Sequence, residues 1–251
     1  MSLAATSRFS EAADDYARFR PSYPPALVDL ILEAAPVPAG GTIVDLGAGT
    51  GISTRLFSGR GFHLIGVEPN AEMRAYADAA KTLGARYLEG TAAKTTLPDR
   101  SADLVIAAQA FHWFPLEETL GELRRILVPG GAFAAFWNVR GDSPFMQAYR
   151  ALLGTLGEYE KVPKPEPTLA ALEARPELER VRHAELPYAQ VLDEAGLLGR
   201  AKSSSYVAHA GPGQAAFLAA LSQLFEQHQV GGKVELSYRT VVSVFRFRDR
   251  A

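Results

Sequence analysis

The sequence predicts an α/β protein built on an open, doubly wound and mostly parallel sheet. Between residues 42 and 137, short apolar runs alternate five times with longer amphipathic stretches. A glycine-rich turn follows the first apolar run, and an acidic residue ends the second. Strands that alternate with helices form right-handed βαβ units, and such units build a parallel sheet.

The predicted elements follow a regular order along the chain. Strands are predicted within 42–49, 63–70, 85–92, 103–109 and 132–138. Helices are predicted within 51–61, 71–84 and 116–131, the last two stopped by Gly84 and by Pro129-Gly130-Gly131.

The alternation breaks at residues 141–189, a stretch rich in proline and charge. Long connections of this kind are usually lids or binding segments, so a helical cap is expected here, after the fifth strand. Beyond it, a helix is predicted over 189–199, an extended segment over 201–208, a helix over 213–228 and a half-buried strand over 234–248.

Composition narrows the classes of function. The chain has 251 residues, 47% of them hydrophobic, and no apolar run near the length that spans a membrane. Its first residues include acidic side chains and lack an apolar stretch, so no signal peptide is expected. A cytoplasmic location is therefore expected. The formal net charge of −2, with the densest arginines at 175–182 lying among glutamates, disfavours a nucleic-acid partner.

Metal chemistry is not expected either. The chain contains no cysteine, which excludes thiolate ligands, disulfides and a thiol nucleophile. The five histidines (63, 112, 183, 209 and 228) show no ligand spacing.

The most informative stretch is IVDLGAGTG, which contains Asp45, Gly47, Gly49 and Gly51. Glycines at a strand-to-helix turn let a ligand approach the backbone and leave N–H groups free at the helix start. Glu68 ends the second strand, where a carboxylate accepts hydrogen bonds from ribose hydroxyls in nucleotide sites. Without a ligand, the same residues would form only a tight turn and a strand-end charge.

The glycine spacing differs from that of dinucleotide sites, which use G-x-G-x-x-G. The run from Asp45 to Gly51 resembles the first motif of class I S-adenosylmethionine-dependent methyltransferases. Further family landmarks follow in order at Glu68-Pro69-Asn70, Gly90-Thr91-Ala92, Leu97-Pro98-Asp99, Asp103-Leu104-Val105 and Leu123–Gly131. The resemblance is dense over 42–137 and looser in the flanks.

This resemblance implies a seven-stranded, Rossmann-like sheet whose last strand is antiparallel, with 234–248 as that strand and 201–208 beside it. It implies S-adenosylmethionine as the cofactor and S-adenosylhomocysteine as the product. The cofactor residues it implies are Tyr16, Arg20, Asp45, Gly47, Ala48, Gly49, Gly51, Glu68, Pro69, Met73, Thr91, Ala92, Gln109, Ala110 and Trp113. Many members carry Asp where this chain has Thr91, which leaves the adenine contact less defined than the ribose contact.

A single domain over 1–251 is expected. Its parts are an N-terminal lid and helix in 1–40, the cofactor-binding core in 42–138, a substrate cap inserted in 141–189 between strands five and six, and C-terminal strands and helices in 190–251.

The stretch QAFHWF, Gln109 to Phe114, follows the fourth strand and is therefore expected at the cleft. With the N-terminal FSEAADDYARFRPSYP, it resembles a subset of small-molecule methyltransferases related to trans-aconitate methyltransferases. Phe111, Trp113 or Phe114 can offer an aromatic face to a sulfonium. His112 is the candidate catalytic residue, as a general base or as an orienting group. The alternative is that all four side chains only pack.

The N-terminal segment offers Tyr16, Arg20 and Tyr23 ahead of a helix beginning near Pro25. In related methyltransferases this segment folds over the cofactor, and a guanidinium suits a carboxylate of the cofactor or of an acidic substrate. A solvent-facing surface cap is the alternative. Asn138, at the end of the fifth strand, is a candidate substrate contact.

The predicted function is methyl transfer from S-adenosylmethionine to a small-molecule acceptor, a carboxylate, hydroxyl or amine, by in-line displacement. A nicotinamide-dependent oxidoreductase and a non-catalytic cofactor-binding regulatory protein are the alternatives. A protein substrate also stays open.

Overall fold

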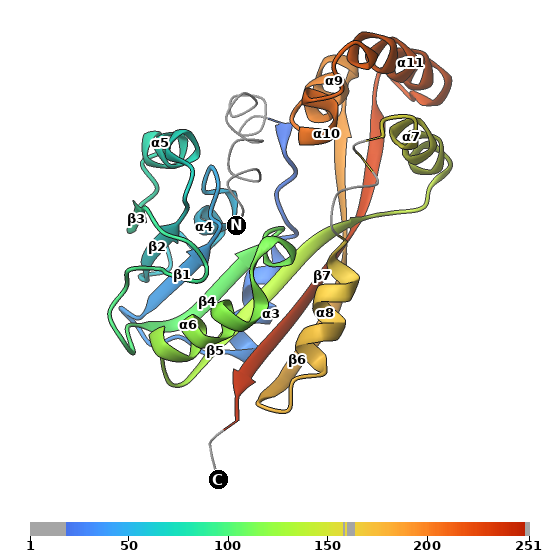
Figure 1. The fold of residues 1–251 in the computed structure, drawn as a ribbon. Coiled ribbons are helices and arrows are strands. Elements are labelled where there is room, and N and C mark those ends of the chain that lie inside the picture. The colour runs from blue at the N-terminus through green and yellow to red at the C-terminus, as the bar shows by residue number, and fades with distance from the viewer. Residues whose placement is uncertain (1–18, 158, 160–163, 249–251) are drawn as a thin grey trace.

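The computed structural model describes residues 19–157, 159 and 164–248, and Tyr16 lies outside them. A seven-stranded sheet forms the centre of the molecule, with helices on both of its faces (Figure 1). The strands are β1 (Thr42–Leu46), β2 (His63–Val67), β3 (Ala85–Leu88), β4 (Ala102–Ala108), β5 (Leu127–Arg140), β6 (Leu178–Leu192) and β7 (Val234–Phe247).

The strand order is β3-β2-β1-β4-β5-β7-β6. Strands β1 to β5 pair in parallel, and β7 runs antiparallel to both β5 and β6. This confirms the predicted seven-stranded, mostly parallel sheet and the antiparallel strand at 234–248. Because β1, β2 and β4 run in the same direction from the middle of the sheet, their carboxyl ends meet at one edge, where open α/β sheets bind ligands.

The described helices are α3 (Ala26–Ala34), α4 (Ile52–Leu56), α5 (Ala71–Ala79), the 3-10 turn η1 (Phe111–Trp113), α6 (Leu116–Ile126), α7 (Pro144–Gly154), α8 (Pro165–Glu173), α9 (Glu194–Lys202), α10 (Ser205–Ala208) and α11 (Gly213–His228). Neighbouring strand residues face opposite sides, and this alternation builds two cores. Val44 and Val105 pack with α6 and α8, whereas Ile43 and Leu104 pack with α3.

We call the helices α7, α9, α10 and α11 the helical lobe. A third apolar cluster joins this lobe to the end of β6 and the beginning of β7. Figure 1 shows these four helices gathered at one end of the two long strands. The insertion between β5 and β6 is helical, as predicted, and contains α7 and α8. Only α7 belongs to the lobe, because Leu172 of α8 packs in the core of the sheet.

Two predictions for the C-terminal third are wrong. Residues 201–208 are helical in α9 and α10 rather than extended, and residues 189–192 end β6 rather than begin a helix. The sixth strand instead begins at Leu178, within the stretch expected to form the cap. This strand lies at the sheet edge, where charged residues and Pro187 are tolerated, so its sequence resembled a polar connection.

Packing explains why 201–208 is not a strand. Ser203 and Ser204 form the turn between α9 and α10 and are buried, and the Ser203 hydroxyl donates to the Arg200 carbonyl 2.7 Å away. Asp193 caps α9 by accepting from the Gly196 N–H at 2.8 Å. Among the described residues, no helix is both long and apolar enough to cross a membrane.

Candidate active site at the carboxyl edge of the sheet

The glycine turn follows β1 directly. Gly47, Gly49 and Gly51 have φ angles of 69°, 55° and 77°, in the left-handed region that favours glycine. A Cβ on Gly47 would lie 2.9 Å from the Cβ of Ala110, so glycine is required for this close approach. A Cβ on Gly49 would meet no atom of the described residues within 4 Å, so these residues leave space above this part of the turn.

Glu68 ties the second strand to this turn. The Gly49 N–H donates to Glu68 Oε2 at 3.0 Å, and the Asn70 N–H donates to Oε1 at 2.9 Å. Burial raises the pKa of Glu68, while the N–H groups of Asn70 and Gly49 oppose that rise. Each carboxylate oxygen has a second lone pair, so the pair can still accept two hydroxyl hydrogen bonds.

Asp45 lies beneath the turn and is only 1% exposed. Ser53 Oγ and Thr54 Oγ1 donate to its Oδ2 at 2.6 and 2.7 Å, whereas its buried Oδ1 has no hydrogen-bond partner among the described residues. Burial raises the pKa of Asp45 to about 6. The hydrogen bonds from Ser53 and Thr54 lower this pKa, and the nearby charge of Glu68 raises it further. Asp45 therefore supports the turn from below.

The other predicted cofactor residues on this side of the sheet come after β2 and β3. Met73 is buried, and its N–H donates to the Asn70 side chain, which caps α5. Pro69 is partly buried. Thr91 pairs with Lys94 after β3, and Ala92 is buried in the core of the sheet.

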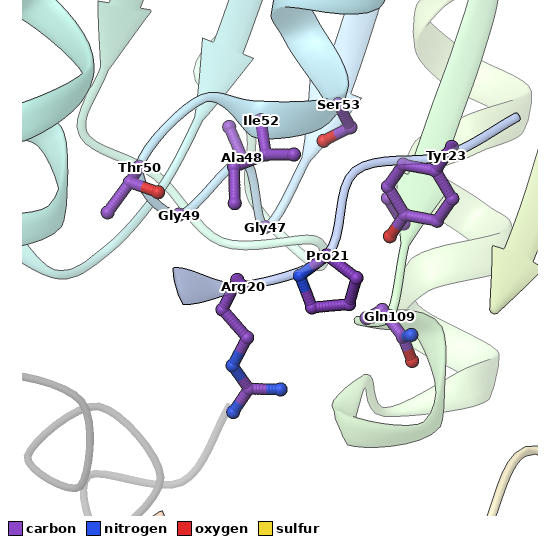
Figure 2. A pocket seen from close by; sticks show the side chains of 11 residues that line it. Arg20, Pro21, Tyr23, Gly47, Ala48, Gly49, Thr50, Ile52, Ser53 and Gln109 are labelled. Carbon is purple, nitrogen blue, oxygen red and sulfur yellow. The ribbon is translucent and has the colours of Figure 1, made fainter. Parts of the chain in front are cut away.

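Residues 19–23 cross over the glycine turn. Together they enclose a cavity of about 40 Å³ lined by Arg20, Pro21, Tyr23, Gly47, Ala48, Gly49, Thr50, Ile52, Ser53, Ala108 and Gln109. Figure 2 shows Pro21 between Gly47 and Gln109, with the guanidinium of Arg20 extending away from the turn. That guanidinium donates to the Ser203 carbonyl in the helical lobe at 3.0 Å.

Two amide side chains hold this segment in place. Asn138 Nδ2 donates to the Ser22 carbonyl at 2.9 Å, and Gln190 Nε2 donates to the Phe19 carbonyl at 2.9 Å. Asn138 also accepts from Thr240 Oγ1 at 2.6 Å. Asn138 therefore acts here as a tether between β5 and the N-terminal segment.

Gln109, which follows β4, has a φ angle of 54° although it is not glycine. Its N–H donates to the Phe136 carbonyl at 2.9 Å, which holds this backbone conformation. Backbone strain of this kind is concentrated at functional sites. The strain is located where the carboxyl end of β4 meets the cavity.

His112 lies in η1 and contacts a buried tryptophan. Trp137 Nε1–H donates to His112 Nδ1 at 3.0 Å, and burial lowers the pKa of His112 to about 4. A neutral imidazole whose Nδ1 accepts a hydrogen bond carries its proton on Nε2. His112 is therefore a hydrogen-bond donor at neutral pH.

The aromatic residues of QAFHWF divide between core and site. Phe111 is 2% exposed and stacks on Phe133 at 5.9 Å, so it belongs to the core and offers no face to a ligand. Phe114 packs against the position where Gly47 lacks a Cβ. Trp113 is partly buried, with its ring 5.2 Å from that of His112.

Ser53 and Thr54, which shape the site, were not predicted from the sequence, whereas Trp137 was expected at the cleft rim beside Asn138. The position of these two hydroxyl residues soon after Gly51 could have indicated their role, because both donate to Asp45 in the preceding strand. Nothing in the sequence pointed from Trp137 to His112. Across residues 19–157, 159 and 164–248, no three metal-ligating side chains gather.

Comparison with known proteins agrees with this geometry. A family model described as a methyltransferase domain matches residues 44–135. Malonyl-[acyl-carrier protein] O-methyltransferase of Pectobacterium atrosepticum is 31% identical over 256 residues, which cover 98% of this chain and 96% of the relative.

A second relative, an uncharacterised methyltransferase of Mycobacterium tuberculosis, is 37% identical over 163 residues, 63% of this chain. The chain spans 65% of that relative's length, just under two thirds. A solved structure from Anaeromyxobacter dehalogenans, described as a candidate type II methyltransferase, superposes with a TM-score of 0.72 at 26% identity, over 91% of this chain and 98% of that one. The chain belongs to the class I S-adenosylmethionine-dependent methyltransferases.

Proposed function

We propose that the protein transfers a methyl group from S-adenosylmethionine to a small-molecule acceptor by in-line displacement. The observation that carries this proposal is the Gly49–Glu68 hydrogen bond of 3.0 Å, which joins the glycine turn to the acid of β2 at the carboxyl edge of the sheet. Family membership supports the same chemistry. Neither this hydrogen bond nor family membership favours a nicotinamide-dependent reaction.

The residues present fit this cofactor. Glu68 has two acceptor sites left for a pair of ribose hydroxyls, and the described residues leave space above Gly49. When bound, S-adenosylmethionine would supply an activated methyl group. We assign its contacts to Arg20, Asp45, Gly47, Ala48, Gly49, Gly51, Glu68, Pro69, Met73, Thr91, Ala92, Gln109, Ala110 and Trp113, with Tyr16 as a further predicted contact outside the described residues.

The cavity beneath residues 19–23 is much smaller than this cofactor. Its volume of about 40 Å³ suits a few water molecules, since one water needs roughly 10–15 Å³ on this measure. We propose that residues 19–23 move outward for the cofactor to enter and close over it afterwards. In this proposal the N-terminal segment is a lid, held by Asn138 and Gln190.

His112 would orient the acceptor. Its Nε2–H can donate to an acceptor oxygen, but its Nδ1 is engaged by Trp137 and is not available to take a proton. An acceptor that is already anionic needs no general base. This favours a carboxylate acceptor, as in the trans-aconitate methyltransferase-like subset, and we propose that the protein belongs to that subset. A cytoplasmic location remains part of the proposal.

The test combines cofactor binding with turnover. S-adenosylhomocysteine should raise the melting temperature of the wild type, and Glu68→Gln should abolish this shift. Glu72→Gln is the matched control, because it removes the same charge from an exposed position in the first turn of α5. Methyl transfer is then measured against small carboxylic acids, phenols and amines. Binding without transfer to any of them would favour the non-catalytic alternative.

A further inference from the structure

Two arginines of the helical lobe and its border have no carboxylate partner. Arg140 ends β5, and Arg200 lies in α9 and is 5% exposed. None of the ion pairs among the described residues includes either of them. A buried positive charge is costly unless it is paired, so this arrangement needs an explanation.

Tyrosines surround Arg140. Its guanidinium donates to the hydroxyls of Tyr206 and Tyr159, the latter at 3.3 Å. It also lies over the ring faces of Tyr149, Tyr159 and Tyr206, with centroid distances of 5.9, 5.5 and 6.0 Å. Tyr238 is its cross-strand partner in β7. These contacts hold the guanidinium in place without neutralising its charge.

The neighbouring donors are only partly used. Arg200 donates to the hydroxyls of Ser203 and Ser204 at 3.4 and 3.0 Å, but its buried Nε has no partner within the described part of the chain. The buried hydroxyls of Tyr149 and Tyr238 have none there either. Unpartnered buried donors beside two positive charges are the groups that an oxyanion would bind.

The electrostatic potential in this cluster is positive. Burial alone would raise the pKa of Tyr206, but the charges of Arg140 and Arg200 outweigh burial and lower it to about 8. Arg140 is partly exposed, whereas Arg200 and Tyr206 are buried, so Arg140 is the most exposed of the three.

The cluster lies close to the proposed methyl-transfer site. Arg140 is two residues beyond Asn138 on β5, about 7 Å along the strand and on the same face of the sheet. Asn138 binds Ser22 of the lid, and its carbonyl lies 3.4 Å from Gln109 Nε2. A small molecule seated at Gln109 can therefore extend one end to Arg140.

We propose that Arg140, Arg200, Tyr149, Tyr206 and Tyr238 form a binding site for an anionic group, a carboxylate or a phosphate, of the methyl acceptor. The inference rests on the proposed function, and it adds which part of the acceptor is recognised and by which residues. The guanidinium groups supply the charge, and the unpartnered Tyr149 and Tyr238 hydroxyls supply further donors.

The test uses protein saturated with S-adenosylhomocysteine and isothermal titration with three probes: succinate, its neutral counterpart succinamide, and inorganic phosphate. Wild type should bind succinate, phosphate or both, and should not bind succinamide. The anion that binds more tightly identifies the anionic group of the acceptor as a carboxylate or a phosphate. Arg140→Gln should weaken this binding at least about tenfold, because it removes a charged donor. Arg140→Lys should restore only part of it, since the guanidinium fork is lost.

Arg150→Gln is the matched control, because Arg150 is an exposed arginine of the same lobe that pairs with Asp142. It should bind the anion as wild type does. Tyr206→Phe removes one hydroxyl with little change in side-chain volume. It replaces Arg140→Gln as the test variant if Arg140→Gln does not fold. Unchanged anion binding in a folded Arg140→Gln or Tyr206→Phe, or no anion binding by wild type, overturns the anion site. Failure of S-adenosylhomocysteine to bind wild type would instead overturn the proposed function.

Discussion

Trp137 Nε1–H donates to His112 Nδ1 across 3.0 Å, joining the end of β5 to the turn after β4. The hydrogen bond fixes the imidazole tautomer, and burial lowers its pKa to about 4. The nitrogen that remains available, Nε2, therefore carries a proton. The question raised by the sequence, whether His112 is a base or an orienting group, becomes a question that substitutions can answer.

His112→Gln should retain more activity than His112→Asn. A glutamine amide reaches the position of Nε2 and can still donate, whereas an asparagine amide reaches only the position of Nδ1, beside Trp137. We expect kcat to fall less than about tenfold in His112→Gln and by about 10- to 100-fold in His112→Asn, the range for a hydrogen bond to a charged group. Equal and complete loss in both variants would indicate a general base.

His112 should also make folding stability depend on pH. Its folded-state pKa of about 4 lies below the ordinary value of 6.5, so the unfolded chain binds the extra proton first. The free energy of unfolding should therefore fall as pH drops from about 6.5 to about 4. Urea denaturation of wild type and His112→Gln at pH 7.5, 6.0 and 4.5 checks this, because the variant should lose less stability over the same window.

Asp45→Asn should stabilise the cofactor-free protein near pH 7.5. Burial raises the pKa of Asp45 from 3.8 to about 6, so its charge destabilises the folded state once pH rises through that value. Since one pKa unit corresponds to about 1.4 kcal/mol, a shift from 3.8 to about 6 corresponds to a gain of about 3 kcal/mol. Urea denaturation at pH 7.5 and pH 4 measures it, and the gain should vanish at the lower pH.

The same substitution should weaken S-adenosylhomocysteine binding. Ser53 and Thr54 use only Oδ2 of Asp45, and its Oδ1 has no partner among the described residues. Such a trade between stability and function is common at active sites. A variant that is both more stable and unimpaired in titration calorimetry would mean that the carboxylate has no role in binding.

The sequence predicted the half of the fold in which local patterns and tertiary contacts agree. Apolar runs such as 104–108 had to be central strands, and the spacing from Gly47 to Gly51 located the turn. The edge strand β6 was missed because its charged residues and Pro187 are tolerated only at an edge, which is a property of the assembled sheet. Likewise, the pairs Trp137–His112 and Arg140–Tyr206 join residues that are distant in sequence, so no local pattern predicts them.

Gly49→Ala should abolish cofactor binding and lose no more stability than a matched glycine substitution. The new Cβ would meet no atom of the described residues within 4 Å, so it would project into the space proposed for the ligand. Gly211→Ala is a matched control, since Gly211 has the same φ angle of 55° and equally open surroundings, but lies between α10 and α11. Both variants should lose about 1–2 kcal/mol from left-handed strain. Only Gly49→Ala should lose the thermal shift with S-adenosylhomocysteine.

Gly199→Ala should release the N-terminal segment from the helical lobe. A Cβ at position 199 would lie 2.4 Å from the ring of Phe19, a distance that real contacts do not allow. The ring must therefore move, and the adjacent hydrogen bond from Gln190 to the Phe19 carbonyl should weaken with it. If residues 19–23 are a lid, limited chymotrypsin digestion after Phe19 should become faster than in wild type, and S-adenosylhomocysteine should protect the variant less.

Gly121→Ala provides the control for that comparison. Gly121 lies in α6 with nothing within 4 Å of its missing Cβ, so alanine there should be neutral or slightly stabilising. It should leave chymotrypsin cleavage after Phe19 unchanged. If Gly199→Ala accelerates cleavage but leaves the binding and release rates of S-adenosylhomocysteine unaltered, residues 19–23 cover the site without gating it. Faster release in the variant, measured by stopped-flow fluorescence, is the outcome expected of a lid, because the contact that keeps the segment closed has been removed.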